Sequence, residues 1–138
     1  MRGVSLALAV AVVLQWAYGN VHKNCVVTTD DTGSVNTCMT KLACLCYKKN
    51  EPFFARNSPP GVKLTTKFSD GGHFTRGVCQ GGYWHDPEKR TSWEPTYSLK
   101  GKQWEQCALS HEVRQLCENK QEVLPYVKAR AVCDPQDL

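Results

Sequence analysis

The residues best suited to catalysis are histidines beside acidic residues, and two such pairs stand out. His111-Glu112 begins a segment close to the metalloprotease motif H-E-x-x-H, but its fifth position is Gln115. Because the motif needs a second imidazole one helical turn away to hold zinc, we expect no metal site there. His85-Asp86 is half of an acid–base pair, and no G-x-S-x-G segment or glycine-rich phosphate loop accompanies it. We therefore expect no catalytic residue, no cofactor and no metal, and predict that the protein is not an enzyme.

The cysteines could either bind zinc or form disulfides, and their spacing separates the two possibilities. A zinc site would need C-x₂-C or Cys/His pairs, whereas the only close pair here is Cys44-x-Cys46. An even number of cysteines in a secreted chain instead predicts disulfides formed in an oxidising compartment. We expect four of them, with the pairing left open by the spacing, among eight residues: Cys25, Cys38, Cys44, Cys46, Cys79, Cys107, Cys117 and Cys133.

The stretch Cys38–Tyr47 contains the close cysteine pair, and we expect the fold to be organised around it. In an extended chain, Cys44 and Cys46 would project from the same side, and apolar residues would cover both sides. A strand that is apolar on both faces is usually covered on both faces. Cysteines two apart in a strand are poorly placed to bond to each other, so each should reach a different, distant partner. The pattern predicts a central C-x-C strand that anchors two disulfides.

The N-terminus has the pattern of a secretory signal peptide. A basic residue precedes an apolar run over residues 4–14, and the small residues Ala17 and Gly19 follow at cleavage positions. The apolar run is shorter than the roughly 20 residues that cross a bilayer as a helix. We expect residues 1–19 to be a signal peptide and residues 20–138 to be a single disulfide-rich domain, secreted to the extracellular space without a transmembrane segment.

The middle of the chain predicts antiparallel strands. Val62–Phe68 alternates apolar side chains with polar ones, which is typical of a half-buried strand. The turn residues that follow should return the chain as a second strand, His73–Cys79, whose Cys79 would link this hairpin to the central strand. A further strand is expected at Cys25–Thr29, ending at the turn Asp30–Gly33.

The last segment predicts a helix and one more strand. Over residues 106–120, Val113, Leu116 and Cys117 recur at helical spacing, and Ser110 is placed as an N-cap. Cys117 would then tie this helix to the sheet. Alternation over Tyr126–Cys133 favours a strand. The complete prediction is a small disulfide-rich α+β fold: a short antiparallel sheet with a central C-x-C strand, one C-terminal helix and four disulfides.

Charge is divided unevenly along the chain. Residues 41–102 carry eleven Lys and Arg against five Asp and Glu, whereas residues 103–138 carry four against six. A basic middle would favour anionic partners such as acidic protein surfaces, lipid headgroups or sulfated glycans, but its scattered residues are more typical of an ordinary solvated surface. No segment resembles a nucleic-acid-binding module, and secretion argues against nucleic acid as the partner.

Large aromatic residues gather between positions 83 and 104. Aromatic rings beside cations are typical of protein-binding surfaces. They are somewhat more typical of a small core in which aliphatic residues are scarce, and the sequence leaves both interpretations open. The candidate binding face combines the cations with one of these rings and comprises Lys63, Lys67, Arg76, Trp84, Lys89 and Arg90.

The function that these features favour is binding without catalysis. We expect a secreted effector of the venom or salivary (toxin) type, acting as a monomer on an extracellular protein such as an ion channel or a host defence protein. Disulfides order the binding face before contact, so less affinity is lost on binding. The alternatives are an endogenous cystine-rich signalling or matrix protein, and a protease inhibitor that uses the loop Asn57–Pro60 as bait.

Overall fold

The computed structural model describes residues 21–50, 72–86 and 88–135. The expected signal peptide, the expected strand Val62–Phe68 and the loop Asn57–Pro60 lie outside these residues, as do Lys63 and Lys67. Among the residues that are described, no helix is long and apolar enough to span a membrane.

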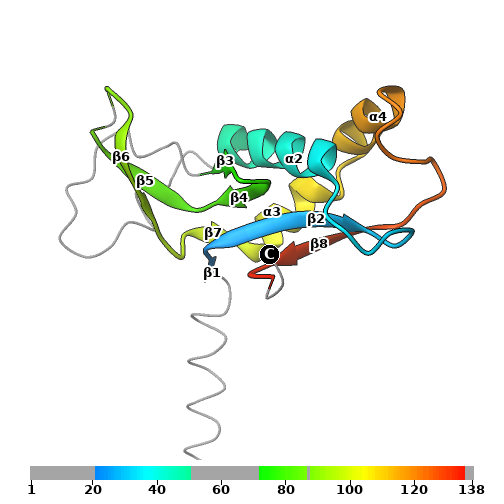
Figure 1. Ribbon diagram of the computed structural model, residues 1–138, viewed down its shortest axis with the longest axis horizontal. Helices are drawn as coiled ribbons and strands as arrows, with labels where there is room; N and C mark the ends of the chain where they lie inside the picture. The colour runs from blue at the N-terminus through cyan, green and yellow to red at the C-terminus, as the bar shows by residue number, and fades with distance from the viewer. Residues whose placement is uncertain (1–20, 51–71, 87, 136–138) are drawn as a thin grey trace, which may run out of the picture.

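The described chain forms the expected small α+β fold with short antiparallel sheets and four disulfides (Figure 1). The main sheet has the order β3-β4-β2-β8, and its neighbouring strands are antiparallel. α2 lies across one face of this sheet, with α3 and α4 beside it (Figure 1). The main sheet comprises β2 (Asn24–Thr29), β3 (His73–Thr75), β4 (Val78–Gln80) and β8 (Ala129–Cys133); the helices are α2 (Thr37–Asn50), α3 (Gly101–Ala108) and α4 (His111–Asn119).

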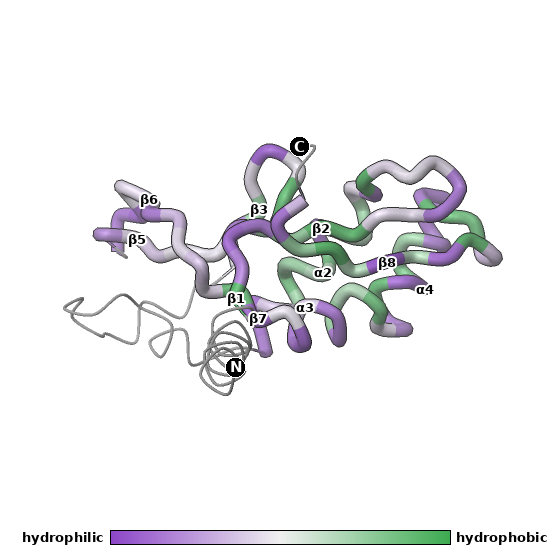
Figure 2. The backbone as a smooth tube through the Cα atoms, turned by 90° about the horizontal axis from the view of Figure 1, so that it is seen from below, coloured by the Kyte–Doolittle hydropathy of each residue, from purple (hydrophilic) through white to green (hydrophobic). Residues whose placement is uncertain are grey.

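Two smaller strand pairs complete the fold. β1 (Val21–His22) pairs with β7 (Leu99–Lys100), next to the start of α3. β5 (Gly82–Asp86) and β6 (Thr91–Pro95) form a separate two-stranded ribbon at one end of the molecule (Figure 1). In Figure 2 the apolar colouring is concentrated on β2, β8 and α2, whereas the ribbon is mostly polar, so the core lies between α2 and the main sheet.

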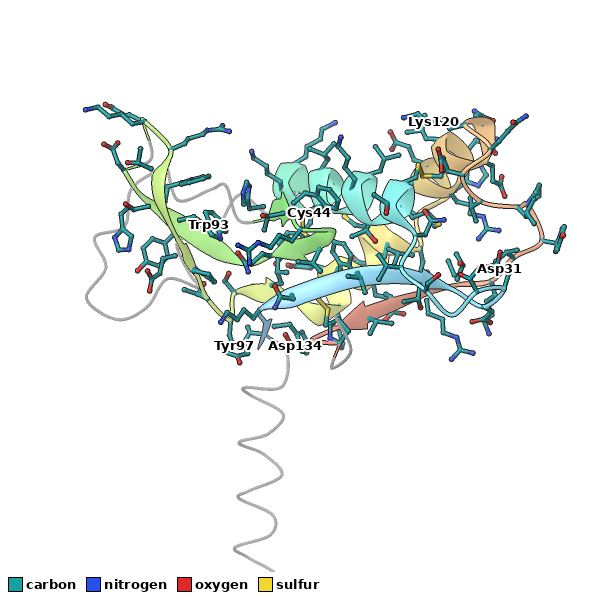
Figure 3. All side chains as sticks on the ribbon, viewed as in Figure 1. Asp31, Cys44, Trp93, Tyr97, Lys120 and Asp134 are labelled. Carbon is teal, nitrogen blue, oxygen red and sulfur yellow. A yellow bond between two sulfur atoms is a disulfide. The ribbon has the colours of Figure 1, made fainter. Side chains whose placement is uncertain are left out.

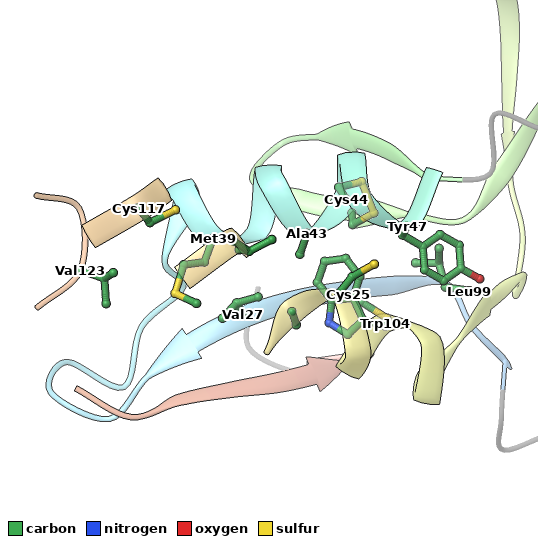
Figure 4. Close-up of a cluster of buried hydrophobic side chains, with 14 of the residues drawn as sticks. Cys25, Val27, Met39, Ala43, Cys44, Tyr47, Leu99, Trp104, Cys117 and Val123 are labelled. Carbon is green, nitrogen blue, oxygen red and sulfur yellow. A yellow bond between two sulfur atoms is a disulfide. The ribbon is translucent and has the colours of Figure 1, made fainter. Parts of the chain in front are cut away.

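The core explains why Cys38–Tyr47 forms a helix rather than the central strand that we predicted. Met39, Ala43 and Tyr47 lie four residues apart, and their side chains are fully or almost fully buried towards the sheet and α3 (Figure 4). Alanine, leucine, methionine and lysine are all good helix formers. A short run with apolar residues on every side fits a buried helix as well as a buried strand, and periodicity alone does not separate the two.

Helix α2 is nevertheless the anchor of the disulfides. Cys44 bonds to Cys79 in β4 and Cys46 bonds to Cys107 in α3, which confirms that the close pair reaches two distant partners. Residues two apart on a helix point about 200° apart around the axis, so these bonds leave α2 in different directions. The other two disulfides are Cys38–Cys117 and Cys25–Cys133. The bond of Cys117 therefore ties α4 to α2, and not to the sheet as we expected.

Other predicted elements differ in their boundaries. The single helix expected over residues 106–120 is two helices, because the chain turns at Leu109 before Ser110 caps α4, its Oγ accepting a hydrogen bond from Val113 N at 3.3 Å. The strand predicted at His73–Cys79 is a hairpin that reverses at Arg76-Gly77, where both residues have positive φ angles. The strands predicted near the two ends are confirmed as β2 and β8.

Asp134 fastens the end of β8 to the beginning of the described chain. Its Oδ2 lies 2.8 Å from His22 Nδ1, and its Oδ1 accepts hydrogen bonds from the backbone N–H groups of Lys23 and Asn24 at 3.0 and 3.2 Å. Partial burial by itself raises the pKa of the Asp134 carboxyl, but these hydrogen bonds outweigh it and hold the pKa below its ordinary value. The ionised carboxylate therefore contributes to closing the fold.

Candidate binding face

The β5–β6 ribbon is the part of the described chain that extends farthest from the disulfide-linked body (Figures 1 and 2). Its strands pair antiparallel, with Trp84 opposite Trp93 and Tyr83 opposite Glu94. None of the eight cysteines lies in it. The ribbon therefore keeps its shape through its own strand pairing and through contacts at its root.

Gly81 and Gly82 hold the ribbon in place where it begins, next to the end of β4. Gly81 N donates to the carbonyl of Lys23 at 2.8 Å, and its own carbonyl accepts from Thr96 N at 2.9 Å. A Cβ atom on Gly82 would lie 2.6 Å from the Trp93 ring and would also collide with the backbone of β6. Only glycine at this position lets the Trp93 ring lie across the strand.

Three rings form an aromatic cluster where the ribbon meets the main sheet. Trp84 and Trp93 pack edge to face, with centroids 5.0 Å apart, and His73 of β3 lies 5.4 and 4.9 Å from them. Trp93 Nε1 also donates to Gln80 Oε1 at 2.7 Å. Since all three rings are partly exposed, the cluster presents aromatic surface to solvent while its positions are fixed by contacts to β3 and β4.

The tip of the ribbon holds exposed charges in a constrained turn. Asp86 Oδ1 accepts a hydrogen bond from Lys89 N at 3.1 Å, which stabilises the reversal. Arg90 and Ser92 have φ angles of 51° and 60°, a region that residues other than glycine rarely occupy. Backbone strain of this kind clusters at functional sites, where the surrounding structure enforces it. The tip is accordingly a candidate contact region.

The opposite face of the ribbon carries a histidine–carboxylate pair. His85 Nε2 lies 3.2 Å from Glu94 Oε2, so the partner of this histidine is not the neighbouring Asp86. Both side chains are about half exposed, and solvent screening leaves such a pair little influence on stability. With Glu88 included, the ribbon has three carboxylates against two cations in its sequence. The ribbon is thus aromatic, but it is not basic.

The structure brings together only part of the predicted binding face. Trp84, Lys89 and Arg90 lie on the ribbon, with both cations exposed at its tip. Arg76 is exposed too, but it lies at the β3–β4 turn, at the end of β4 opposite the one that leads into the ribbon. The predicted face contained neither Trp93 nor His73. The turn formers Asp86-Pro87 between two aromatic segments were the signal that would have paired Trp84 with Trp93.

The aromatic residues of positions 83–104 divide between core and surface. Trp104 is fully buried, and its Nε1 donates to the carbonyl of Val26 at 3.1 Å. Tyr97 is 63% exposed, and the two ribbon tryptophans are half-buried. The core interpretation is therefore confirmed for Trp104, whereas the exposed rings are left as candidates for a binding face.

Comparison with known proteins adds no assignment to this face. No family model matches the chain, and neither curated proteins nor solved structures show significant similarity to it.

Proposed function

We propose that the protein is a secreted, non-enzymatic binding protein of the venom or salivary effector type, and that the β5–β6 ribbon is its binding face. The proposal rests on one observation: the ribbon extends from the disulfide-linked body and presents a fixed, partly exposed pair of tryptophans (Figure 1). The expected target is an extracellular protein such as an ion channel or a host defence protein.

The energetics of interfaces support this choice of surface. Tryptophan and arginine are enriched among the few interface residues that supply most of the binding free energy. Trp84 and Trp93 are already ordered by each other and by Gln80, so little side-chain freedom remains to be lost on contact. Lys89 and Arg90 at the tip would meet acidic groups on the target and would mainly increase the rate of association.

The test uses the oxidised mature chain on a panel of ion channels, recorded by electrophysiology, and of host defence proteins, measured by surface plasmon resonance. For any target found, the ribbon variant Lys89→Ala/Arg90→Ala is compared with the control Lys120→Ala/Lys128→Ala. The control residues are exposed and lie outside the ribbon, and Figure 3 shows Lys120 at the opposite end of the molecule from Trp93. We expect the ribbon variant to bind roughly tenfold more weakly or worse, and the control to bind normally.

A second variant, Trp84→Ala, tests the aromatic part of the face without removing a charge. Circular dichroism spectra that match the wild type would show that both variants keep the fold. If folded ribbon variants bind the target as tightly as the wild type, the ribbon is not the binding face. If the purified protein converts a substrate catalytically, the proposal of a non-enzymatic function is wrong.

A further inference from the structure

A second exposed feature lies away from the ribbon, in the groove between α2 and α4. The groove has a volume of about 320 Å³, and its apolar lining includes Leu42, Leu45, Val113 and Leu116. Leu45 is 54% exposed and Leu116 is 42% exposed. Partly exposed leucines therefore lie on both walls of one groove.

Disulfides tie α2 to α4 and to α3 beside the groove. The Cys38–Cys117 disulfide joins α2 to α4 at one end, and Cys46–Cys107 joins α2 to α3 at the other. Figure 4 shows Cys117 beside the beginning of α2. The bond between α2 and α4 therefore ties the two walls to each other beyond one end of the groove.

The two walls carry opposite charges. Lys49 lies on the α2 wall and Glu112 lies on the α4 wall. Neither side chain forms an ion pair with another residue in the described ranges. A two-fold axis running along the groove would set the α2 wall of one molecule against the α4 wall of its copy, so that Lys49 of each would face Glu112 of the other.

We propose that this groove is the interface of a symmetric homodimer. The face is self-complementary because each molecule supplies both an apolar wall with a lysine and an apolar wall with a glutamate. Leu45 of one copy would be buried in the groove of the other. The sequence led us to expect a monomer, and this groove is the feature that argues for a second copy.

The size of the face indicates a weak dimer. α2 has 14 residues and is therefore about 21 Å long. Two packed helices present a face about 20 Å wide, which gives a projected area of about 400 Å². A standard interface buries about 800 Å² on each partner, so this one belongs among the small and reversible interfaces.

The test is sedimentation velocity on the oxidised mature chain, from low micromolar to near-millimolar concentration. The wild type should approach twice the monomer mass as concentration rises. Leu45→Asp should remain monomeric, whereas Leu124→Asp, a change at a leucine 49% exposed outside the groove, should behave as the wild type. Both substitutions replace exposed leucines, and circular dichroism verifies that each variant is folded.

A charge exchange tests the two-fold arrangement itself. Lys49→Glu and Glu112→Lys should each weaken association about threefold to tenfold, since like charges would then meet across the interface. The double variant should restore the wild-type association. A wild type that stays monomeric at every concentration would overturn the proposal, and so would a dimer that Leu45→Asp leaves intact or a double variant that is not rescued.

Discussion

Replacing Thr40 by valine tests the link between α2 and the main sheet, on which the rigidity of the molecule depends. β4 pairs with β2 only at Asn24 and Cys25, and beyond Cys25 that edge of β2 is covered by the segment leading into α2, which forms the bridge Thr28–Val35, and by α2 itself. There Val27 N donates to Thr40 Oγ1 at 2.9 Å, and the carbonyl of Val27 accepts from Asn36 N at 2.8 Å. Helix α2 thus takes the place of a neighbouring strand.

The effect of Thr40→Val on the free energy of unfolding follows from the burial of Thr40 and from the similar shapes of valine and threonine. Thr40 and Val27 are both fully buried, so no water can replace the lost hydroxyl. Valine has nearly the same volume as threonine, which leaves no cavity. The remaining effect is a buried N–H without an acceptor, which costs about 1–3 kcal/mol. We expect Thr40→Val to lower the free energy of unfolding by that amount.

The assay is equilibrium unfolding in guanidinium chloride without reductant, so that all disulfides stay intact. Thr91→Val, at an exposed position of β6, is the matched control and should change stability by less than about 0.5 kcal/mol. Thr40→Ser keeps the hydroxyl and loses one methyl group, so it should lower the free energy of unfolding by about 1 kcal/mol. If Thr40→Ser proves more destabilising than Thr40→Val, packing rather than the hydrogen bond holds α2 to β2, and the reasoning fails.

Three further predictions concern the ribbon, the chain end and α4. Gly82→Ala should displace the Trp93 ring and alter the near-ultraviolet circular dichroism, at a cost of about 1–3 kcal/mol from overpacking, with an unchanged far-ultraviolet spectrum. The carboxyl of Asp134 has a lowered pKa in the fold, so its contribution is complete above the unfolded value near pH 4 and is lost as pH falls further. Asp134→Asn should therefore be less stable than the wild type at pH 6, and the difference should shrink in unfolding curves below pH 4. A constant difference would show that the ionised carboxylate of Asp134 is not the cause. Ser110→Ala should cost about 1 kcal/mol in thermal or chemical unfolding through loss of the α4 cap, and an unchanged stability would mean that this hydrogen bond contributes nothing.

The two proposed surfaces are compatible with each other. The ribbon begins at Gly82, beyond the end of β4, whereas the groove lies between α2 and α4. No residue of the ribbon lines the groove. A dimer formed through the groove would therefore leave both ribbons available, and two linked ribbons would bind a clustered target more tightly than one.

The sequence by itself determined the features that depend on local chemistry. The even number of cysteines predicted the disulfides, and the alternation near both ends predicted β2 and β8. Ser110 was identified as a helix cap because a hydroxyl at that position can accept a hydrogen bond from the first turn. The different partners of Cys44 and Cys46 were predicted correctly because cysteines two apart in a strand are poorly placed to bond to each other, although the segment is a helix.

Tertiary structure alone decided the rest. Cys38–Tyr47 has apolar residues in every direction, so its helical form depends on which of them the sheet and α3 cover. The same holds for the aromatic residues, because Trp104 and Trp93 differ in burial only through contacts with distant parts of the chain. Disulfide pairing and the α2–α4 groove arise between segments far apart in sequence. The periodicity of a sequence describes one segment at a time, whereas these features depend on contacts between different segments.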